Sequence, residues 1–190
     1  MVTRLAPSLW LQRFAALLRP GGSVLDVACG SGRHVQWLSR QGFAVTGVDR
    51  DAAALAAIEG QAELRVADLE GAPWPLPGRQ FDAVVVTNYL WRPLWPALLG
   101  ALAPGGLLIC ETFALGNQRY GKPSRPDFLL QPGELLRVCA GLRVVAYEDG
   151  LEAEPARCVQ RIAAVQPSHG DTDASAYPLR AEAACAVPAR

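Results

Sequence analysis

The sequence predicts an α/β fold in which helices cover both faces of a doubly wound, mostly parallel sheet. Short hydrophobic segments alternate with helical patterns along the chain, which is typical of such a sheet. A length of 190 residues suits one domain, since domains usually have about 100 to 200 residues. Hydrophobic residues make up 51% of the chain, which is enough for a sizeable core. We expect one domain over residues 1–165 and a mobile tail over 166–190, where periodicity is lost.

The individual elements follow from apolar spacing and from the residues that interrupt it. Apolar residues between positions 5 and 18 recur at helical spacing until Pro20 and two glycines end the pattern. Strands are expected over 23–28, 43–48, 63–67, 81–86, 106–110, 142–147 and 157–165. Further helices are expected over 35–42, 51–58, 94–102 and 133–139. The acidic segment 148–154 is predicted to be the turn between the last two strands.

Composition and charge argue against several classes of function. Eighteen basic residues balance 18 acidic ones, which disfavours nucleic acid or an anionic membrane as a partner. Five cysteines are scattered without a C-x-x-C pair, so neither a disulfide framework nor a metal site is indicated. No apolar run approaches the roughly 18 residues of a membrane span, and we expect a cytoplasmic protein that acts on small molecules as a monomer or homodimer.

The most informative segment is Val24-Leu-Asp-Val-Ala-Cys-Gly-Ser-Gly-Arg-His34. Gly30 and Gly32 follow a predicted strand and precede a predicted helix. At such a position missing side chains let backbone amides approach a ligand at the positive end of the helix. An anionic or nucleotide ligand is therefore expected here. The alternative is a purely structural turn, because two glycines at this spacing are a weak signal on their own.

Polar side chains at the ends of successive strands strengthen this hypothesis. Asp49 follows the second strand, 19 positions after Gly30, where an acid can accept both hydroxyls of a ribose. Asp26 lies in the first strand, whereas Asp68 follows the third strand and Asn88 follows the fourth. Each could equally be a helix cap or a turn residue. As a set they should converge at the carboxyl ends of the strands, where open α/β sheets bind ligands.

A nicotinamide cofactor is the competing hypothesis. Asp49 would bind the ribose of NAD equally well, which would make the chain an oxidoreductase. The dinucleotide fingerprint, however, requires a third small residue, and Val35 stands at that position. No obvious substrate domain with an acid or base for hydride transfer is visible, because His34 lies within the glycine-bearing turn and His169 in the predicted tail.

The residues resemble the class I S-adenosylmethionine-dependent methyltransferases, which share a Rossmann-like sheet. The similarity covers about residues 20 to 165 and rests on the segments 24–32, 48–49, 67–69, 81–86 and 104–109. It implies seven strands with the last antiparallel, and S-adenosylmethionine as the cofactor. The segments 26–34 and 111–113 are most similar to small bacterial proteins related to tellurite-resistance methyltransferases. Ala28 is a departure, since the family often has its first glycine there.

The resemblance also assigns roles in cofactor binding. It implies that the loop from Asp26 to Gly32 holds the methionine portion and that Asp49 holds the ribose. Asp68, with the backbone of Leu69, would hold the adenine, and Asn88 would lie near the reacting end. The predicted cofactor residues are Asp26, Ala28, Cys29, Gly30, Gly32, Arg33, Asp49, Arg50, Asp68, Leu69 and Asn88.

The acceptor should be bound by residues that follow the fourth and fifth strands, but no catalytic residue can be singled out. The candidates are Tyr89, Trp91, Arg92, Glu111, Phe113, Arg119, Tyr120 and Lys122. This mixture of aromatic and cationic groups suits an anionic or aromatic small molecule. A thiol, a small acid or a chalcogen oxyanion would fit. In the alternative interpretation, the aromatic residues only pack the next helix and the cations lie on a solvated loop. A non-catalytic protein that binds the cofactor or a partner also remains open.

Overall fold

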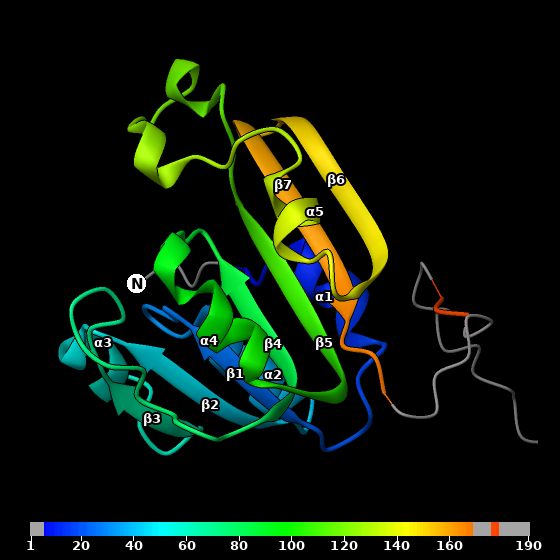
Figure 1. Cartoon of the computed structure of the whole chain (residues 1–190). Coiled ribbons are helices and arrows are strands. Elements are labelled where there is room, and N and C mark those ends of the chain that lie inside the picture. The colour runs from blue at the N-terminus through cyan, green and yellow to red at the C-terminus, as the bar shows by residue number, and fades with distance from the viewer. Residues whose placement is uncertain (1–5, 169–175, 179–190) are drawn as a thin grey trace, which may run out of the picture.

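The computed structural model describes residues 6–168 and 176–178, so most of the predicted tail lies outside the described residues. A seven-stranded sheet with the order β3-β2-β1-β4-β5-β7-β6 forms the centre (Figure 1). The strands are β1 (Ser23–Val27), β2 (Ala44–Asp49), β3 (Glu63–Val66), β4 (Phe81–Thr87), β5 (Leu102–Phe113), β6 (Arg143–Ala153) and β7 (Ala156–Val165). β1 to β5 pair in parallel, and β7 runs antiparallel to both β5 and β6. The predicted mostly parallel sheet with an antiparallel last strand is confirmed.

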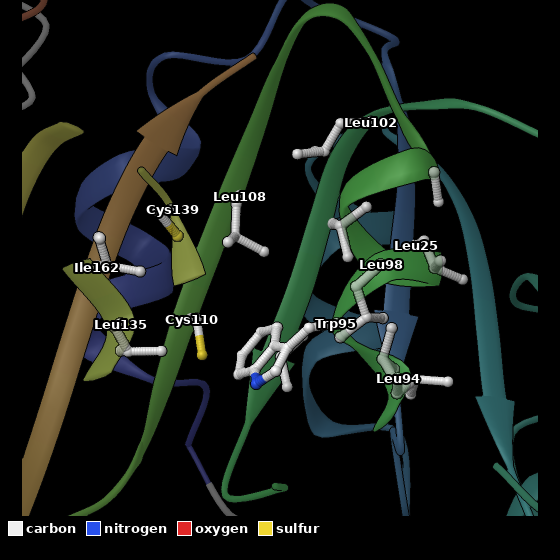
Figure 2. Packing of buried hydrophobic residues seen from close by; sticks show 14 of the residues in the cluster. Leu25, Leu94, Trp95, Leu98, Leu102, Leu108, Cys110, Leu135, Cys139 and Ile162 are labelled. Atoms are coloured by element: carbon white, nitrogen blue, oxygen red, sulfur yellow. The ribbon is translucent and has the colours of Figure 1, made fainter. Parts of the chain in front are cut away.

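Helices cover both faces of this sheet. They are α1 (Leu9–Ala15), α2 (Arg33–Arg40), α3 (Ala52–Ala56), α4 (Trp95–Gly100) and α5 (Glu134–Val138), together with the 3-10 turns η1 (Arg92–Leu94), η2 (Asn117–Arg119) and η3 (Pro126–Phe128). α1, α2 and α3 pack on one face, and α4 and α5 pack on the other. Figure 2 shows Trp95 and Leu98 of α4 and Leu135 of α5 on the second face, beside Leu108 and Ile162 of the sheet.

Alternation along the strands produces these two cores. In β1, Val24 contributes to the cluster under α1 and α2, whereas Leu25 contributes to the cluster under α4. Successive side chains of a strand point to opposite faces, so a strand covered on both faces is apolar at nearly every position. Apart from Ser23 at its start, the one polar residue of β1 is Asp26, which is fully buried. A buried acid in an otherwise apolar strand indicates a site.

The prediction of a turn over 148–154 is wrong. β6 continues to Ala153, and the chain reverses at Glu154 and Pro155. The acidic residues of this segment face basic residues of β7: Glu148 pairs with Arg161 and Glu152 with Arg157 in the register of the two strands. Opposite charges across neighbouring strands stabilise such pairs, and this partner is invisible when the segment is considered alone. β5 is also longer than predicted, because it begins at Leu102, where a helix end was expected.

No helix in the described part of the chain is long and apolar enough to cross a membrane.

Candidate active site

The glycine-bearing turn joins β1 to α2 through three left-handed residues. Ala28 has φ 52°, Gly30 φ 54° and Gly32 φ 72°. A glycine adopts this conformation without strain, whereas an alanine does so at a cost of roughly 1 kcal/mol. The departure at Ala28 therefore keeps the shape of the turn and strains one residue. Gly32 has a second constraint, because a Cβ atom at this position would overlap Cδ1 of Ile58.

Asp49, at the end of β2, connects the second strand to this turn. Its Oδ2 accepts a hydrogen bond from the backbone N–H of Gly30 at 2.7 Å, and its Oδ1 accepts one from the N–H of Asp51 at 2.9 Å. These two bonds fix the orientation of the carboxylate, because each oxygen is tied to a different backbone segment. The half-buried side chain is thereby placed beside the turn.

Asp26 has an unusual environment. Both of its carboxylate oxygens are buried, and neither has a hydrogen-bond partner among the described residues. The nearest cationic candidate is His34, whose Nδ1 lies 3.8 Å from Oδ1. A buried carboxylate without a donor is energetically costly, so this group requires a partner that a bound molecule can supply.

His34 is itself buried and has defined partners. The backbone N–H of Ser8 donates to its Nε2 at 3.1 Å. Because Nε2 accepts, the proton of the neutral ring belongs on Nδ1. Nδ1 lies 3.2 Å from Oγ1 of Thr87 and faces Asp26. The ring thus joins the start of α1 to the ends of β1 and β4.

A first cavity of about 200 Å³ opens at the carboxyl ends of these strands. Its lining residues are Ala28, Asp49, Arg50, Ala67, Asp68, Leu69, Glu70 and Tyr89. Five of them were predicted to bind the cofactor: Ala28, Asp49, Arg50, Asp68 and Leu69. Three carboxylates and one guanidinium line the cavity, so it favours a cationic ligand. Of the other predicted cofactor residues, Asn88 lines the second cavity described next, and the guanidinium of Arg33 contacts the carbonyl of Ala6.

A second cavity of about 270 Å³ adjoins the first. Its lining residues are Glu70, Asn88, Tyr89, Leu90, Thr112, Phe113, Pro123 and Phe128. Glu70 and Tyr89 belong to both cavities. The hydroxyl of Tyr89 is buried without a hydrogen-bond partner among the described residues. Burial, followed by the nearby charges of Glu70 and Asp68, raises the pKa of Tyr89, so the phenol stays neutral and can donate a hydrogen bond to a ligand.

The structure separates the predicted acceptor residues into two groups. Tyr89 and Phe113 line the second cavity, whereas the remaining six candidates line neither cavity. Trp91 packs against the core, and three others are exposed on the loop after β5: Arg119, Tyr120 and Lys122. Sequence reasoning missed Glu70, Leu90, Thr112, Pro123 and Phe128. Only Glu70 carried a signal, since it directly follows Asp68 and Leu69.

Arg92 binds protein groups instead of facing a cavity. Its Nε and Nη2 donate to the carboxylate of Glu134 at 2.7 and 2.9 Å, and its Nη1 and Nη2 donate to the carbonyls of Asp127 and Leu129. Burial disfavours ionisation of Glu134, but the hydrogen bonds from Arg92 outweigh it and lower the pKa of that carboxyl. Arg92 therefore fixes the segment that carries Phe128 against α5.

Glu111, near the end of β5, lies in a network of ion pairs. Its carboxylate is paired with Arg157 and Arg161 of β7, and it accepts a hydrogen bond from Oγ of Ser8 at 3.3 Å. Arg161 also contacts Glu148 and Glu152. Burial lowers the pKa of Arg161, but these carboxylates more than compensate and raise it overall. The network ties α1 to the β6–β7 hairpin. The carboxylates of Glu111, Glu148 and Glu152 are already paired with arginines within it.

Comparisons with known proteins agree with this geometry. Residues 24–106 match the sequence model of a family described as "Methyltransferase domain". No curated protein matches the chain. TehB from Haemophilus influenzae has the same fold, with 19% identity and a TM-score of 0.64 over 80% of this chain, which spans 59% of that protein.

Two further solved structures share the fold over nearly their whole length. An S-adenosylmethionine-dependent methyltransferase from Methanosarcina mazei is 17% identical, with a TM-score of 0.66 over 86% of this chain and 100% of that one. A TehB-like S-adenosylmethionine-dependent methyltransferase from Corynebacterium glutamicum is 21% identical, with a TM-score of 0.60 over 84% of this chain and 87% of that one.

The family match shows a methyltransferase domain over residues 24–106, and the solved structures show a Rossmann-like fold shared with S-adenosylmethionine-dependent methyltransferases. The matched residues contain the glycine-bearing turn, Asp49 and Asp68. The predicted resemblance, including its similarity to the tellurite-resistance group, is confirmed as a similarity of sequence over this segment and of fold.

Proposed function

We propose that the chain transfers a methyl group from S-adenosylmethionine in the first cavity to a small molecule in the second. The observation that carries this proposal is the junction of the two cavities. They share Tyr89 and Glu70 at the carboxyl ends of the strands, so molecules bound on either side would meet there. In open α/β sheets this edge is where ligands bind.

The unpartnered carboxylate of Asp26 supports the fit of the cofactor. S-adenosylmethionine carries a sulfonium and an ammonium group, and both are cations. Asp26 is buried and lacks a donor, so we assign it to the ammonium group. The acidic lining of the first cavity suits a cation as well.

The other parts of the cofactor have counterparts at the same edge. We assign the methionine carboxylate to the backbone amides of the turn over 28–32, where the positive end of α2 favours an anion. Asp49 is assigned to the ribose hydroxyls, because its carboxylate lies at the end of β2 and lines the first cavity. Asp68 and the backbone of Leu69 are assigned to the adenine.

The cofactor supplies a methyl group that its sulfonium has already activated, so a dedicated base is not required for every acceptor. The residues of this chain have to hold the acceptor in line and keep water away. Leu90, Phe113 and Phe128 offer apolar surface for the second task. Asn88 and the hydroxyl of Tyr89 offer polar groups for the first.

Of the predicted acceptors, the structure supports the aromatic and thiol types more than the anionic ones. A small acid or a chalcogen oxyanion needs cationic donors. Arg92 is occupied by Glu134, and neither Arg119 nor Lys122 lines the second cavity. We further propose that the protein acts in the cytoplasm, as a monomer or homodimer, on small molecules and not on nucleic acid or membranes. The described cysteines are all free, which suits a reducing compartment.

The experiment that tests this function measures formation of S-adenosylhomocysteine with a panel of thiols, amines, small acids and chalcogen oxyanions. Turnover with at least one small molecule, lost in Asp26→Asn, supports the proposal. Tight cofactor binding without turnover on any member of the panel would instead favour the non-catalytic alternative.

A further inference from the structure

The second cavity combines aromatic rings with a single charged group. Tyr89, Phe113 and Phe128 contribute the rings, and Glu70 contributes the charge. No lysine or arginine is among its lining residues within the described part of the chain. The carboxylate of Glu70 lies near enough to the phenol of Tyr89 to raise its pKa, in addition to the larger effect of burial. The cavity is therefore negative as well as apolar.

These groups together match the requirements of an organic cation. The face of an aromatic ring attracts an ammonium group, and a carboxylate adds a direct ion pair. An anion would be repelled by Glu70 and would find no cationic donor. A neutral apolar molecule would gain from the rings alone. The cavity therefore distinguishes among ligands of the same size by their charge.

The walls of the cavity are held in place before a ligand binds. Arg92 donates to the carbonyls of Asp127 and Leu129, on either side of Phe128. The buried Asn117 donates from Nδ2 to the carbonyl of Pro123 at 3.0 Å, and its Oδ1 accepts from the N–H of Cys158 in β7. Pre-formed walls reduce the entropy that binding would otherwise lose.

We propose that the methyl acceptor is a small amine, bound in the second cavity as its ammonium form by Glu70 and the three rings. This inference rests on the proposed function, because it assigns the second cavity to the acceptor. A volume of about 270 Å³ limits the acceptor to a small molecule. Methylation requires the free amine, so the bound ammonium would first give one proton to water. The amine nitrogen would then form its bond to the methyl carbon as the carbon–sulfur bond of the cofactor breaks, which leaves S-adenosylhomocysteine.

The test compares three probes of similar shape and different charge: benzylamine, benzyl alcohol and benzoate. Their binding to the full chain, saturated with S-adenosylhomocysteine, is measured by ligand-observed NMR. We expect benzylamine to bind about tenfold more tightly than benzyl alcohol, which is the contribution of one close charge interaction, and benzoate to bind least.

Two variants connect this preference to the cavity. Glu70→Gln should abolish the preference for benzylamine over benzyl alcohol, and Phe128→Leu should weaken it. Glu59→Gln is the matched control, because Glu59 is an exposed residue after α3 that does not line the second cavity, and it should leave the preference intact.

Three results would overturn the inference: benzoate binding as tightly as benzylamine, no binding of benzylamine, or an unchanged preference in Glu70→Gln. Calorimetric titration of the ligand-free proteins with S-adenosylhomocysteine keeps the two proposals apart. If S-adenosylhomocysteine did not bind, the proposed function would be contradicted. Cofactor binding without a preference for the amine would contradict only the assignment of the acceptor.

Discussion

The backbone N–H of Ser8 donates to Nε2 of His34 at 3.1 Å, which joins the first turn of α1 to the helix that follows the glycine-bearing turn. Both residues are buried. Through the other side of its ring, His34 faces Thr87 and the carboxylate of Asp26. The leading helix is thus attached directly to the ends of β1 and β4.

His34→Ala should destabilise the protein, because it leaves the buried N–H of Ser8 without an acceptor. A lost partner of this kind costs about 1 to 3 kcal/mol. Urea unfolding followed by circular dichroism measures the change. A loss below about 0.5 kcal/mol, the usual effect of a surface substitution, would show that the bond contributes little.

Asp49→Ala should weaken binding of S-adenosylhomocysteine. Hydrogen bonds from ribose hydroxyls to a charged acceptor contribute about 1.5 to 3 kcal/mol, so the dissociation constant should rise roughly 10- to 150-fold. Asp51→Ala is the control, because Asp51 caps α3 through the N–H groups of Ala53 and Ala54 and should affect stability more than affinity. Equal affinity of wild type and Asp49→Ala would remove Asp49 from the ribose site.

The two glycines of the turn should respond differently to alanine. Both have positive φ, but a Cβ atom at Gly30 would meet nothing within 4 Å, whereas one at Gly32 would overlap Ile58. Gly30→Ala should therefore cost about 1 kcal/mol of stability and mainly reduce cofactor affinity, since its methyl group enters the space assigned to the methionine portion. Gly32→Ala should lose more stability. Thermal unfolding measures the stability of both variants, and calorimetry measures their affinity for the cofactor. A larger loss of stability in Gly30→Ala than in Gly32→Ala would contradict this assignment.

Arg92→Met should act on stability and not on the cofactor. It leaves the carboxylate of Glu134, whose side chain is 12% exposed, without its charged partner, which should cost about 1 to 3 kcal/mol. Arg119→Met is the control, since Arg119 is exposed. We expect unchanged affinity for S-adenosylhomocysteine in both variants. If the unfolding midpoint of Arg92→Met equalled that of the wild type, Arg92 would not fix the segment that carries Phe128.

Acid should destabilise the fold between about pH 4 and pH 2. Burial raises the pKa of Asp82, but hydrogen bonds from Arg19 and Ser23 outweigh it and hold that pKa at about 2. Because this value lies below that of the unfolded chain, the contribution is present above about pH 4 and is lost as the pH falls toward 2. Asp82→Asn should flatten the pH dependence of urea unfolding in this window. If the free energy of unfolding changed with pH equally in Asp82→Asn and wild type, the assignment of this effect to Asp82 would be refuted.

The sequence predicted the part of the site that is local along the chain. A glycine turn after an apolar strand, and acids at successive strand ends, placed Ala28, Asp49, Asp68 and Leu69 around one cavity, because parallel strands end at a common edge. The parallel topology was predictable for the same reason.

The acceptor cavity was less predictable, since its walls depend on contacts between distant segments. Phe128 reaches the cavity on a loop whose position is set by Arg92. Arg92 donates to the carbonyl of Leu129, which lies 37 residues further along the chain. Arg92 and Glu111 were expected to face a substrate because they are polar and follow strand ends. Their partners, Glu134 and Arg161, come from α5 and β7, and only the three-dimensional pairing reveals that they are occupied.

The most direct test of the central claim is calorimetric titration of the wild-type chain with S-adenosylhomocysteine, with NADH in a parallel cell. We expect S-adenosylhomocysteine to bind with a dissociation constant in the range of roughly 1 μM to 1 mM typical for enzyme ligands, and NADH to give no heat. Binding of NADH alone would restore the oxidoreductase alternative. Silence with both ligands would contradict the assignment of the first cavity to a nucleotide cofactor.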